Sequence, residues 1–217
     1  MILSVCPNPS VDCTIELDML KTGALNRVEN KVITYSGKAL NAAIGVARLG
    51  GDSFATGFMF DDNGKMFVHT LDDEGVKNTF VWNKGGARTN YKIVDKRSMM
   101  TEINDKGESV GEKEQDELAD LVGELSATAS VVIMSGSLPS GVADDYYFRL
   151  SERIPKNVKK IFDVTGDRLV NALKGGAYLV KPNLDELREI TGEHYDGFDE
   201  MLGGCRRLLD AGAENVM

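Results

Sequence analysis

Short apolar runs alternate along the chain with longer amphipathic segments. Buried strands are predicted for the runs "MILSVC" (1–6), "SFATGFM" (53–59), "SVVIM" (130–134), "VKKIFDV" (158–164) and "AYLV" (177–180). Helices are predicted for the segments 36–51, 61–75, 112–125 and 198–212, where apolar side chains recur three and four positions apart. Alternation of this kind predicts an α/β fold, in which helices cover both faces of a parallel sheet.

Two regions interrupt this alternation. Residues 13–35 and 88–104 alternate polar and apolar side chains without a helix between them, which is typical of half-exposed antiparallel strands. We expect them to form a small sheet that projects from the α/β body. Such a sheet can serve as a lid over a pocket, as a dimer surface, or as both.

Composition and charge narrow the class of protein. The 217 residues suffice for one layered core and contain no internal repeat or low-complexity linker. The net charge of −9, without a stripe of Lys and Arg, argues against a nucleic-acid binder. No segment approaches a membrane span, and no secretion signal is visible. The three cysteines, Cys6, Cys13 and Cys205, have no metal-ligand spacing and fit a reducing compartment, so we expect a cytoplasmic protein.

The pair Gly37-Lys38 precedes the first predicted helix, where free backbone N–H groups favour anions. A P-loop needs an earlier glycine and a Ser or Thr directly after the lysine. Val32 and Ala39 occupy those two positions. The segment is therefore not a P-loop, and a ligand bound here must be held in another way.

Polar side chains follow several of the predicted strands. Asn8 and Asp12 come after the first strand, "SGSLPSG" (135–141) after the run 130–134, and "KPNLDE" (181–186) after the run 177–180. Asp163 lies at the end of the run 158–164. Ligands of open parallel sheets gather beyond the carboxyl ends of the strands. Carboxylates, hydroxyls, glycines and a lysine at this edge suit a phosphorylated substrate and a metal-bound nucleotide.

The order of short motifs along the chain resembles one known family. The motifs are "NPSVD", "GALNRV", "SGKALN", "ARTNYKI", "TEIND", "SGSLPSG", "DVTG" and "KPNLDE". Together they resemble the ribokinase-like sugar kinases of the PfkB family, most closely the 1-phosphofructokinases and tagatose-6-phosphate kinases. The resemblance implies a Rossmann-like body with a β-sheet lid, which often pairs with a second subunit to form a homodimer. It also implies transfer of the γ-phosphoryl group of ATP, with Mg²⁺, to a hydroxyl of a sugar phosphate.

Four positions match residues that bind the sugar in this family. Asp12 resembles the aspartate that accepts hydrogen bonds from sugar hydroxyls, although an Asx turn after Pro9 is an equally good interpretation. Gly37 would let the backbone approach the sugar, and Asn41 would bind it through its amide. A polar residue on the first turns of a helix is the alternative for Asn41. Lys38 is expected either to reach the substrate's phosphate or to be solvated on the helix surface.

Three further positions match residues that hold the substrate's own phosphate. Arg27 and Arg88 resemble the lid arginines, since a guanidinium makes paired hydrogen bonds to phosphate oxygens. An exposed arginine that protects a sheet edge is the alternative for either one alone. Ser137 resembles a further residue that contacts this phosphate. The alternative for Ser137 is a Gly-Ser turn after a strand, which needs no ligand. Lys92 and Lys96 are expected to be solvated.

The segment 181–186 matches the family's nucleotide and metal positions. Lys181 resembles the lysine beside the transferring phosphates. Asn183 and Glu186 resemble the pair that organises Mg²⁺ through water molecules, and Asp163 is expected to add another water-mediated contact. Asn183 followed by Glu186 is also a capping-box sequence, which needs no ligand, and the two roles are compatible.

Two departures from the family pattern are visible. Ser36 and Ala39 replace glycines of the family's "GGKG" turn, and a serine there would be strained if the position required a positive φ. The family's "GAGD" stretch, which supplies the catalytic aspartate and an anion hole, is absent. The string "LGGD" (49–52) would lie at the wrong edge of the sheet, and "TGD" (165–167) belongs to "DVTG". We therefore expect residues 1–217 to be the N-terminal portion of a kinase whose catalytic Asp lies beyond Met217, nearly inactive alone.

The most specific expectation is a 1-phosphofructokinase, which phosphorylates the 6-hydroxyl of fructose 1-phosphate to give fructose 1,6-bisphosphate. A tagatose-6-phosphate kinase, acting at the 1-hydroxyl, is one alternative. A non-catalytic sugar-phosphate-binding protein that ends at Met217 is the other. A nucleoside kinase is disfavoured, because Arg27 and Arg88 imply an acceptor that already carries a phosphate.

Overall fold

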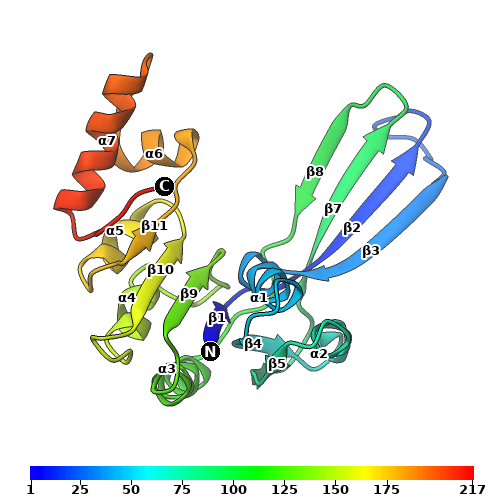
Figure 1. Ribbon diagram of the computed structural model, residues 1–217. Helices are drawn as coiled ribbons and strands as arrows, with labels where there is room; N and C mark the ends of the chain where they lie inside the picture. The colour runs from blue at the N-terminus through cyan, green and yellow to red at the C-terminus, as the bar shows by residue number, and fades with distance from the viewer.

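The computed structural model describes residues 1–217, and its body is built on one parallel sheet (Figure 1). Six strands cross this sheet in the order β11-β10-β9-β1-β4-β5, and a seventh, β6, pairs with β4. They are β1 (Ile2–Cys6), β4 (Ser53–Phe60), β5 (Lys77–Asn78), β6 (Val81–Asn83), β9 (Val131–Ser135), β10 (Lys159–Asp163) and β11 (Leu179–Val180). The predicted parallel sheet is confirmed, and each of the apolar runs contributes one of its strands.

Seven helices accompany these strands, and the last two, α6 and α7, follow the final strand. They are α1 (Lys38–Arg48), α2 (Gly64–Asp73), α3 (Glu112–Ser126), α4 (Tyr146–Ser151), α5 (Asp167–Leu173), α6 (Leu184–Thr191) and α7 (Phe198–Asp210). The four predicted helices are all present: α1, α2 and α7 are shorter than predicted, whereas α3 extends one residue further, to Ser126. Gly50, whose φ is 80°, follows α1 and takes the backbone out of the helical region. None of the helices is long and apolar enough to cross a bilayer.

The core of the body lies around the central strands β1, β4 and β9. Leu3, Phe58, Met134 and Phe162 are fully buried there, as the short apolar runs require. Tyr146 on α4 stacks on Phe58 with 6.0 Å between ring centroids, which ties the helix layer to the sheet. The core thus fixes the carboxyl ends of these strands relative to one another.

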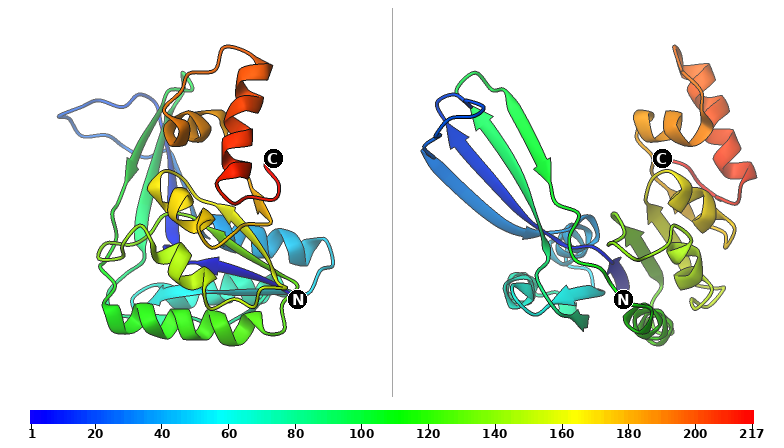
Figure 2. Two further views of the ribbon diagram at one scale, coloured as in Figure 1. Left: turned by 90° about the vertical axis from the view of Figure 1, so that its left-hand side faces the viewer. Right: turned by 180° about the vertical axis from the view of Figure 1, so that it is seen from behind.

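A second sheet of four strands projects from the body and forms the lid (Figure 1). Its order is β3 (Asn30–Ser36), β2 (Ser10–Leu17), β7 (Arg88–Asp95) and β8 (Met100–Asn104). The prediction of purely antiparallel strands is wrong for the central pair: β2 and β7 run parallel, because both leave the body in the same direction. The lid and the helices α6 and α7 rise on either side of the carboxyl edge of the main sheet (Figure 2).

The lid is joined to the body through very short connections. Only the residues 7–9 separate β1 from β2, and only Gly37 separates β3 from α1. In the lid's register Ser10 pairs with Ser36 on one side and with Arg88 on the other. The base of the lid therefore lies directly beside the carboxyl end of β1.

Candidate functional site

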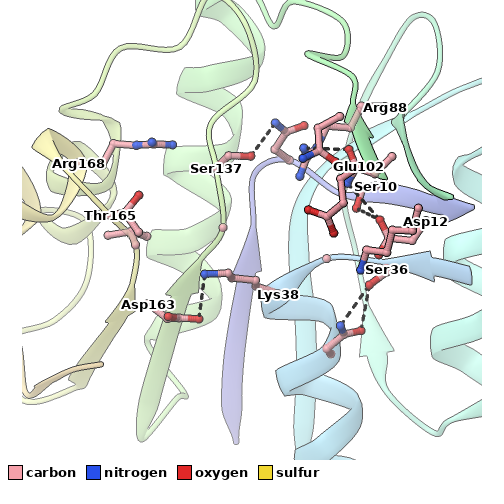
Figure 3. A pocket seen from close by; sticks show the side chains of 18 residues that line it. Ser10, Asp12, Ser36, Lys38, Arg88, Glu102, Ser137, Asp163, Thr165 and Arg168 are labelled. Carbon is pink, nitrogen blue, oxygen red and sulfur yellow. Dashed lines mark hydrogen bonds and ion pairs between the residues drawn. The ribbon is translucent and has the colours of Figure 1, made fainter. Parts of the chain in front are cut away.

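A polar cleft of about 450 Å³ lies between the lid and the carboxyl ends of β1, β9 and β10 (Figure 3). Eighteen residues line it, and only Val164 among them is hydrophobic. Seven of the residues predicted from the sequence line it together: Asp12, Gly37, Lys38, Asn41, Arg88, Ser137 and Asp163. A cleft so rich in hydrogen-bonding groups suits a small polar ligand.

Asp12 lies in the middle of β2 and presents its carboxylate to the cleft. Its Oδ1 atom accepts hydrogen bonds from Ser10 Oγ and from Asn90 Nδ2, each at 3.1 Å. Its Oδ2 atom has no partner within the chain and is available for hydroxyl groups of a ligand. The Asx-turn interpretation is therefore wrong, because Asp12 is a strand residue whose partners come from side chains.

Gly37 and Asn41 bring the start of α1 to the cleft. A Cβ atom on Gly37 would lie 2.7 Å from Cys6 Sγ, so the glycine allows the helix to approach β1 closely. The Asn41 amide donates to Ser36 Oγ at 3.1 Å and also lines the cleft.

The two departures from the family turn have little effect on this geometry. Ser36 ends the strand β3, and Ser98 is the only non-glycine residue with a positive φ, so the strain considered for Ser36 is absent. Ala39 is completely buried and does not line the cleft.

Arg88 stands at the base of β7 and supplies a cation to one end of the cleft. Its Nε atom is buried without a hydrogen-bond partner, and its Nη1 atom donates to Asn90 Oδ1 at 3.4 Å. No carboxylate lies within 4 Å of the guanidinium. Nearby, Asn8, which is only 6% exposed, donates to Ser137 Oγ at 3.1 Å. This end of the cleft offers hydrogen-bond donors, and its guanidinium forms no ion pair within the chain, which suits a phosphate.

Arg27 does not line this cleft. It is exposed on the loop 18–29, which connects β2 and β3 at the outer end of the lid. The second lid arginine thus lies away from Arg88 within one chain, and its role remains a prediction.

A cluster of lysines and carboxylates begins at the opposite end of the cleft, which Lys38 and Asp163 line, and continues outside it to Lys181 and Glu186. Lys38 Nζ lies 3.8 Å from Asp163 Oδ2 and 3.7 Å from Glu186 Oε1, and Lys181 Nζ lies 3.5 Å from Asp163 Oδ1. Ser135 Oγ donates to Asp163 Oδ2 at 3.0 Å. Lys38 is therefore placed with the residues predicted for the nucleotide and the metal, although it was assigned to the sugar phosphate.

Asn183 and Glu186 form the predicted capping box at the start of α6. Asn183 Oδ1 accepts from the Glu186 backbone N–H, and Glu186 Oε2 accepts from the Asn183 backbone N–H, each at 2.9 Å. The other oxygen of Glu186, Oε1, faces Lys38. One carboxylate thus caps the helix and also faces the Lys38 ammonium, so the capping box is confirmed and the predicted metal role stays compatible with it.

The comparisons with known proteins agree with this geometry. Residues 8–217 match the model of the pfkB family carbohydrate kinases. The chain belongs to this family. It is 31% identical over 217 residues to a 1-phosphofructokinase from Borreliella burgdorferi, covering all of this chain and 70% of that protein. It is 32% identical over 219 residues to a D-tagatose-1-phosphate kinase from Bacillus licheniformis, covering 100% of this chain and 71% of that protein.

Solved structures give the same assignment. The tetrameric inhibited form of phosphofructokinase-2 from Escherichia coli has a TM-score of 0.89 and 26% identity, over 99% of this chain and 72% of that one. The predicted ribokinase-like fold is confirmed, and the chain is a carbohydrate kinase of the pfkB family, whose phosphoryl donor is ATP.

The cleft of this pfkB kinase contains residues that sequence reasoning missed. They are Ser10, Asn90, Lys92, Glu102, Asn104, Thr165 and Arg168. Lys92 was expected to be solvated, yet it lines the cleft. Side chains alternate along a strand, so counting by twos from Arg88 places Asn90 and Lys92 on the same face. Glu102 and Asn104 follow by the same rule from their pairing with Lys92 and Asn90.

The residues around Asp163 suit a hydrated Mg²⁺ ion better than a fully protein-bound metal. No group of three His, Cys, Asp or Glu side chains gathers closely enough to hold a metal ion directly. The carboxylates of Asp163 and Glu186 are both within 4 Å of the Lys38 ammonium, so both border the same small space. Magnesium retains several water ligands and needs only one or two carboxylates, so these residues fit it.

Neither short acidic glycine motif replaces the family's catalytic stretch. Asp52 lies before β4 at the amino edge of the main sheet, where it pairs with Lys77 at 3.0 Å. Asp167 begins α5 and is exposed outside the cleft, whereas Thr165 lines it. Within residues 1–217 no aspartate occupies a "GAGD" stretch.

Proposed function

We propose that this pfkB kinase phosphorylates a ketose 1-phosphate at its 6-hydroxyl, with fructose 1-phosphate as the substrate and fructose 1,6-bisphosphate as the product. One observation carries the proposal: a single polar cleft has an arginine without an ion pair at one end, and at the other end Lys38 and Asp163, which belong to a lysine–carboxylate cluster that continues outside the cleft. The first end suits a phosphate already present on the acceptor. The second suits the phosphates of ATP.

The substrate's sugar is held by the residues between these two ends. Asp12 accepts hydrogen bonds from two hydroxyl groups, and Asn41 donates and accepts through its amide. Arg88 and Ser137 bind the phosphate of the substrate. The Asp12 carboxylate, which only accepts hydrogen bonds, and the Asn41 amide, which also donates them, fix the orientation of the sugar. Its free hydroxyl is then directed towards Asp163 and Lys38.

Lys181, Asn183 and Glu186 hold the phosphates of ATP together with Mg²⁺, and Asp163 contributes a further water-mediated contact. When bound, the metal neutralises charge on the transferring phosphoryl group. Lys38 lies within reach of the same position and adds a positive charge there. Residues 1–217 contain no aspartate in a "GAGD" stretch, and a general base is worth roughly 10²- to 10⁴-fold in rate. These residues should therefore bind ligands but transfer the phosphoryl group slowly.

The outer face of the lid supports a homodimer. Ile33, Cys13, Tyr91 and Ile103 lie side by side across the four strands on the face turned away from the cleft. Ile33, Tyr91 and Ile103 are between 40% and 55% exposed, which is a large apolar row for an isolated chain. A second copy offers the same row, and such self-complementary faces form twofold dimers. In this arrangement Arg27, at the outer end of the lid, would serve the cleft of the second copy.

A second candidate substrate is a tagatose phosphate. The relative from Bacillus licheniformis is named for D-tagatose 1-phosphate, which differs from the tagatose 6-phosphate expected from the sequence. Tagatose 1-phosphate and fructose 1-phosphate carry their phosphate at the same carbon, so the same cleft polarity serves both.

Isothermal titration calorimetry with fructose 1-phosphate, tagatose 1-phosphate and tagatose 6-phosphate tests the proposal. We expect fructose 1-phosphate to bind most tightly and the Arg88→Ala variant to lose at least tenfold in affinity. Arg206→Ala is the matched control, since Arg206 is exposed on α7 and makes no ion pair. Preferential binding of tagatose 6-phosphate would overturn the assignment of substrate. Binding that Arg88→Ala leaves unchanged would overturn the assignment of the phosphate end.

A further inference from the structure

A side hollow of about 270 Å³ opens beside the phosphate end of the cleft. It shares Asn8, Arg88 and Ser137 with the cleft, so the two spaces meet at these three side chains. Its other lining residues are Asp105, Lys106, Leu138, Pro139 and Ser140. The hollow therefore lies between the loop after β8 and the loop after β9.

The backbone around this hollow is held in place on both sides. The Val110 N–H donates to the Ser140 carbonyl at 3.0 Å, and Ser109 and Ser140 form a parallel bridge. Gly107 has a φ of 76°, and a Cβ atom there would lie 3.1 Å from Arg88 Cβ. The loop that carries Lys106 thus packs directly on Arg88, at a position that favours glycine.

The charges of the hollow favour an anion. Arg88 and Lys106 both line it, and neither has a carboxylate within 4 Å. The single carboxylate, Asp105, accepts a hydrogen bond from the Gly107 N–H at 3.1 Å, which orders the turn. Ser137 Oγ accepts from Asn8, so its own hydrogen remains free to donate to a ligand.

We propose that Lys106 is a second phosphate-binding cation, and that the phosphate group of the acceptor sits between Lys106, Arg88 and Ser137 where the cleft and the hollow meet. This inference rests on the proposed function and names one more residue that selects phosphorylated over neutral sugars. The two cations come from different elements, Arg88 from the start of β7 and Lys106 from the loop after β8, so together they hold a dianion more firmly than either does alone.

Titration of the full chain and of Lys106→Met with fructose 1-phosphate and with fructose tests this inference. We expect the variant to lose about tenfold or more in affinity for fructose 1-phosphate, since a charge-assisted hydrogen bond is removed, and to bind fructose as the unaltered chain does. Lys106→Arg should restore most of the affinity. The matched control is Lys113→Met, because Lys113 is exposed on α3 and lines neither space.

A double-mutant cycle with Arg88→Met shows whether Lys106 and Arg88 bind the same phosphate group or affect affinity independently of each other. If both cations hold one phosphate, the two losses will not add. Unchanged affinity of Lys106→Met for fructose 1-phosphate, or an equal loss for fructose and its phosphate, would overturn the inference.

Inorganic phosphate distinguishes this inference from the proposed function. If the chain binds no ketose phosphate but binds inorganic phosphate in a Lys106-dependent manner, the phosphate site stands and the proposed function fails. If inorganic phosphate also fails to bind, both fail.

Discussion

Lys38 and Glu186, which are far apart in the sequence, meet at the inner end of the cleft, with 3.7 Å between Nζ and Oε1. The same ammonium lies 3.8 Å from Asp163 Oδ2. It therefore lies between the two carboxylates that we propose as water-mediated contacts of Mg²⁺. This arrangement connects the start of α1 to the start of α6.

Substitution of Lys38 by Met should raise the affinity of the chain for Mn²⁺ in the absence of nucleotide. The lysine is half exposed, and exposed ion pairs are worth about 0.2–1 kcal/mol, so we expect a gain of up to about fivefold. Electron paramagnetic resonance of free Mn²⁺ measures this directly. Lys65→Met on α2 is the control, because that side chain is exposed and unpaired. A lower affinity in Lys38→Met would show that the lysine does not compete with the metal.

Substitution of Glu186 by Gln should separate the helix cap from the metal role. Glutamine can keep the hydrogen bond from the Asn183 N–H, so the free energy of unfolding in urea should change by less than about 0.5 kcal/mol. The lost charge should weaken binding of Mg²⁺-ATP several-fold in calorimetry. Glu186→Ala should lose both properties, with about 1 kcal/mol of stability. Equal stability of Glu186→Ala and the unaltered chain would mean that the capping box contributes nothing.

Substitution of Gly37 by Ala should destabilise the chain by about 1–3 kcal/mol, because the new methyl group would lie 2.7 Å from Cys6 Sγ. Chemical denaturation gives the free energy of unfolding. Cys6→Ala removes the clashing sulfur, so the double variant should be less destabilised than the sum of the two single variants. Strict additivity would contradict this account of Gly37.

Cys6 should resist thiol reagents and should make stability depend on alkaline pH. Burial raises the pKa of its thiol to about 11 from an ordinary value of 9.0. Between these values the unfolded chain loses the thiol proton while the folded chain keeps it. Stability should therefore fall as pH rises from about 9 to 11, by about 1.4 kcal/mol per pH unit.

The difference between the unaltered chain and Cys6→Ala in urea isolates this effect. It removes the contributions of Tyr147, whose pKa burial raises, and of Lys160, whose pKa burial lowers. At pH 8, iodoacetamide should modify the partly exposed Cys205 and leave the buried Cys6 unmodified in the native chain. Rapid labelling of Cys6 at pH 8 would show that the start of α1 opens readily.

A charge on the outer face of the lid should prevent dimer formation. Ile103→Lys places an ammonium at the end of the apolar row, so we expect a monomer by analytical ultracentrifugation where the unaltered chain is a dimer. Met100→Lys is the matched control, since Met100 is 59% exposed but belongs to the other face of the same strand. A monomeric unaltered chain, or an unchanged dimer in Ile103→Lys, would exclude the lid as the interface.

The sequence was most informative where the hydrophobic period is regular. The apolar strand runs and the amphipathic helices predicted the body, because a strand that is buried on both faces of a sheet must be apolar along its whole length. The direction of β7 could not be predicted from alternation, since parallel and antiparallel strands share the same period of two. That ambiguity explains why the lid was expected to be antiparallel.

Site residues that stand in a recognisable motif were predicted. Residues that reach the cleft only through the register of strand pairing were missed. Asp12, Arg88 and Asp163 stand in recognisable motifs, and all three line the cleft. Lys92 and Glu102 reach it through strand pairing, which a single sequence does not record. The location of Lys38 beside Glu186 depends on how the starts of α1 and α6 are placed in the fold. No local sequence pattern specifies that arrangement.

The row Ser36–Ser10–Arg88 at the base of the lid has a mechanical consequence. Ser36 is followed immediately by Gly37 and α1, and Arg88 is itself the first residue of β7. The lid therefore joins the body along this row, while Asp163 and Lys181 belong to the body. A rotation of the lid about the row would move Asp12 relative to Asp163 but leave the backbone of Arg88 nearly in place, so it would change the width of the cleft without displacing the cation at its end.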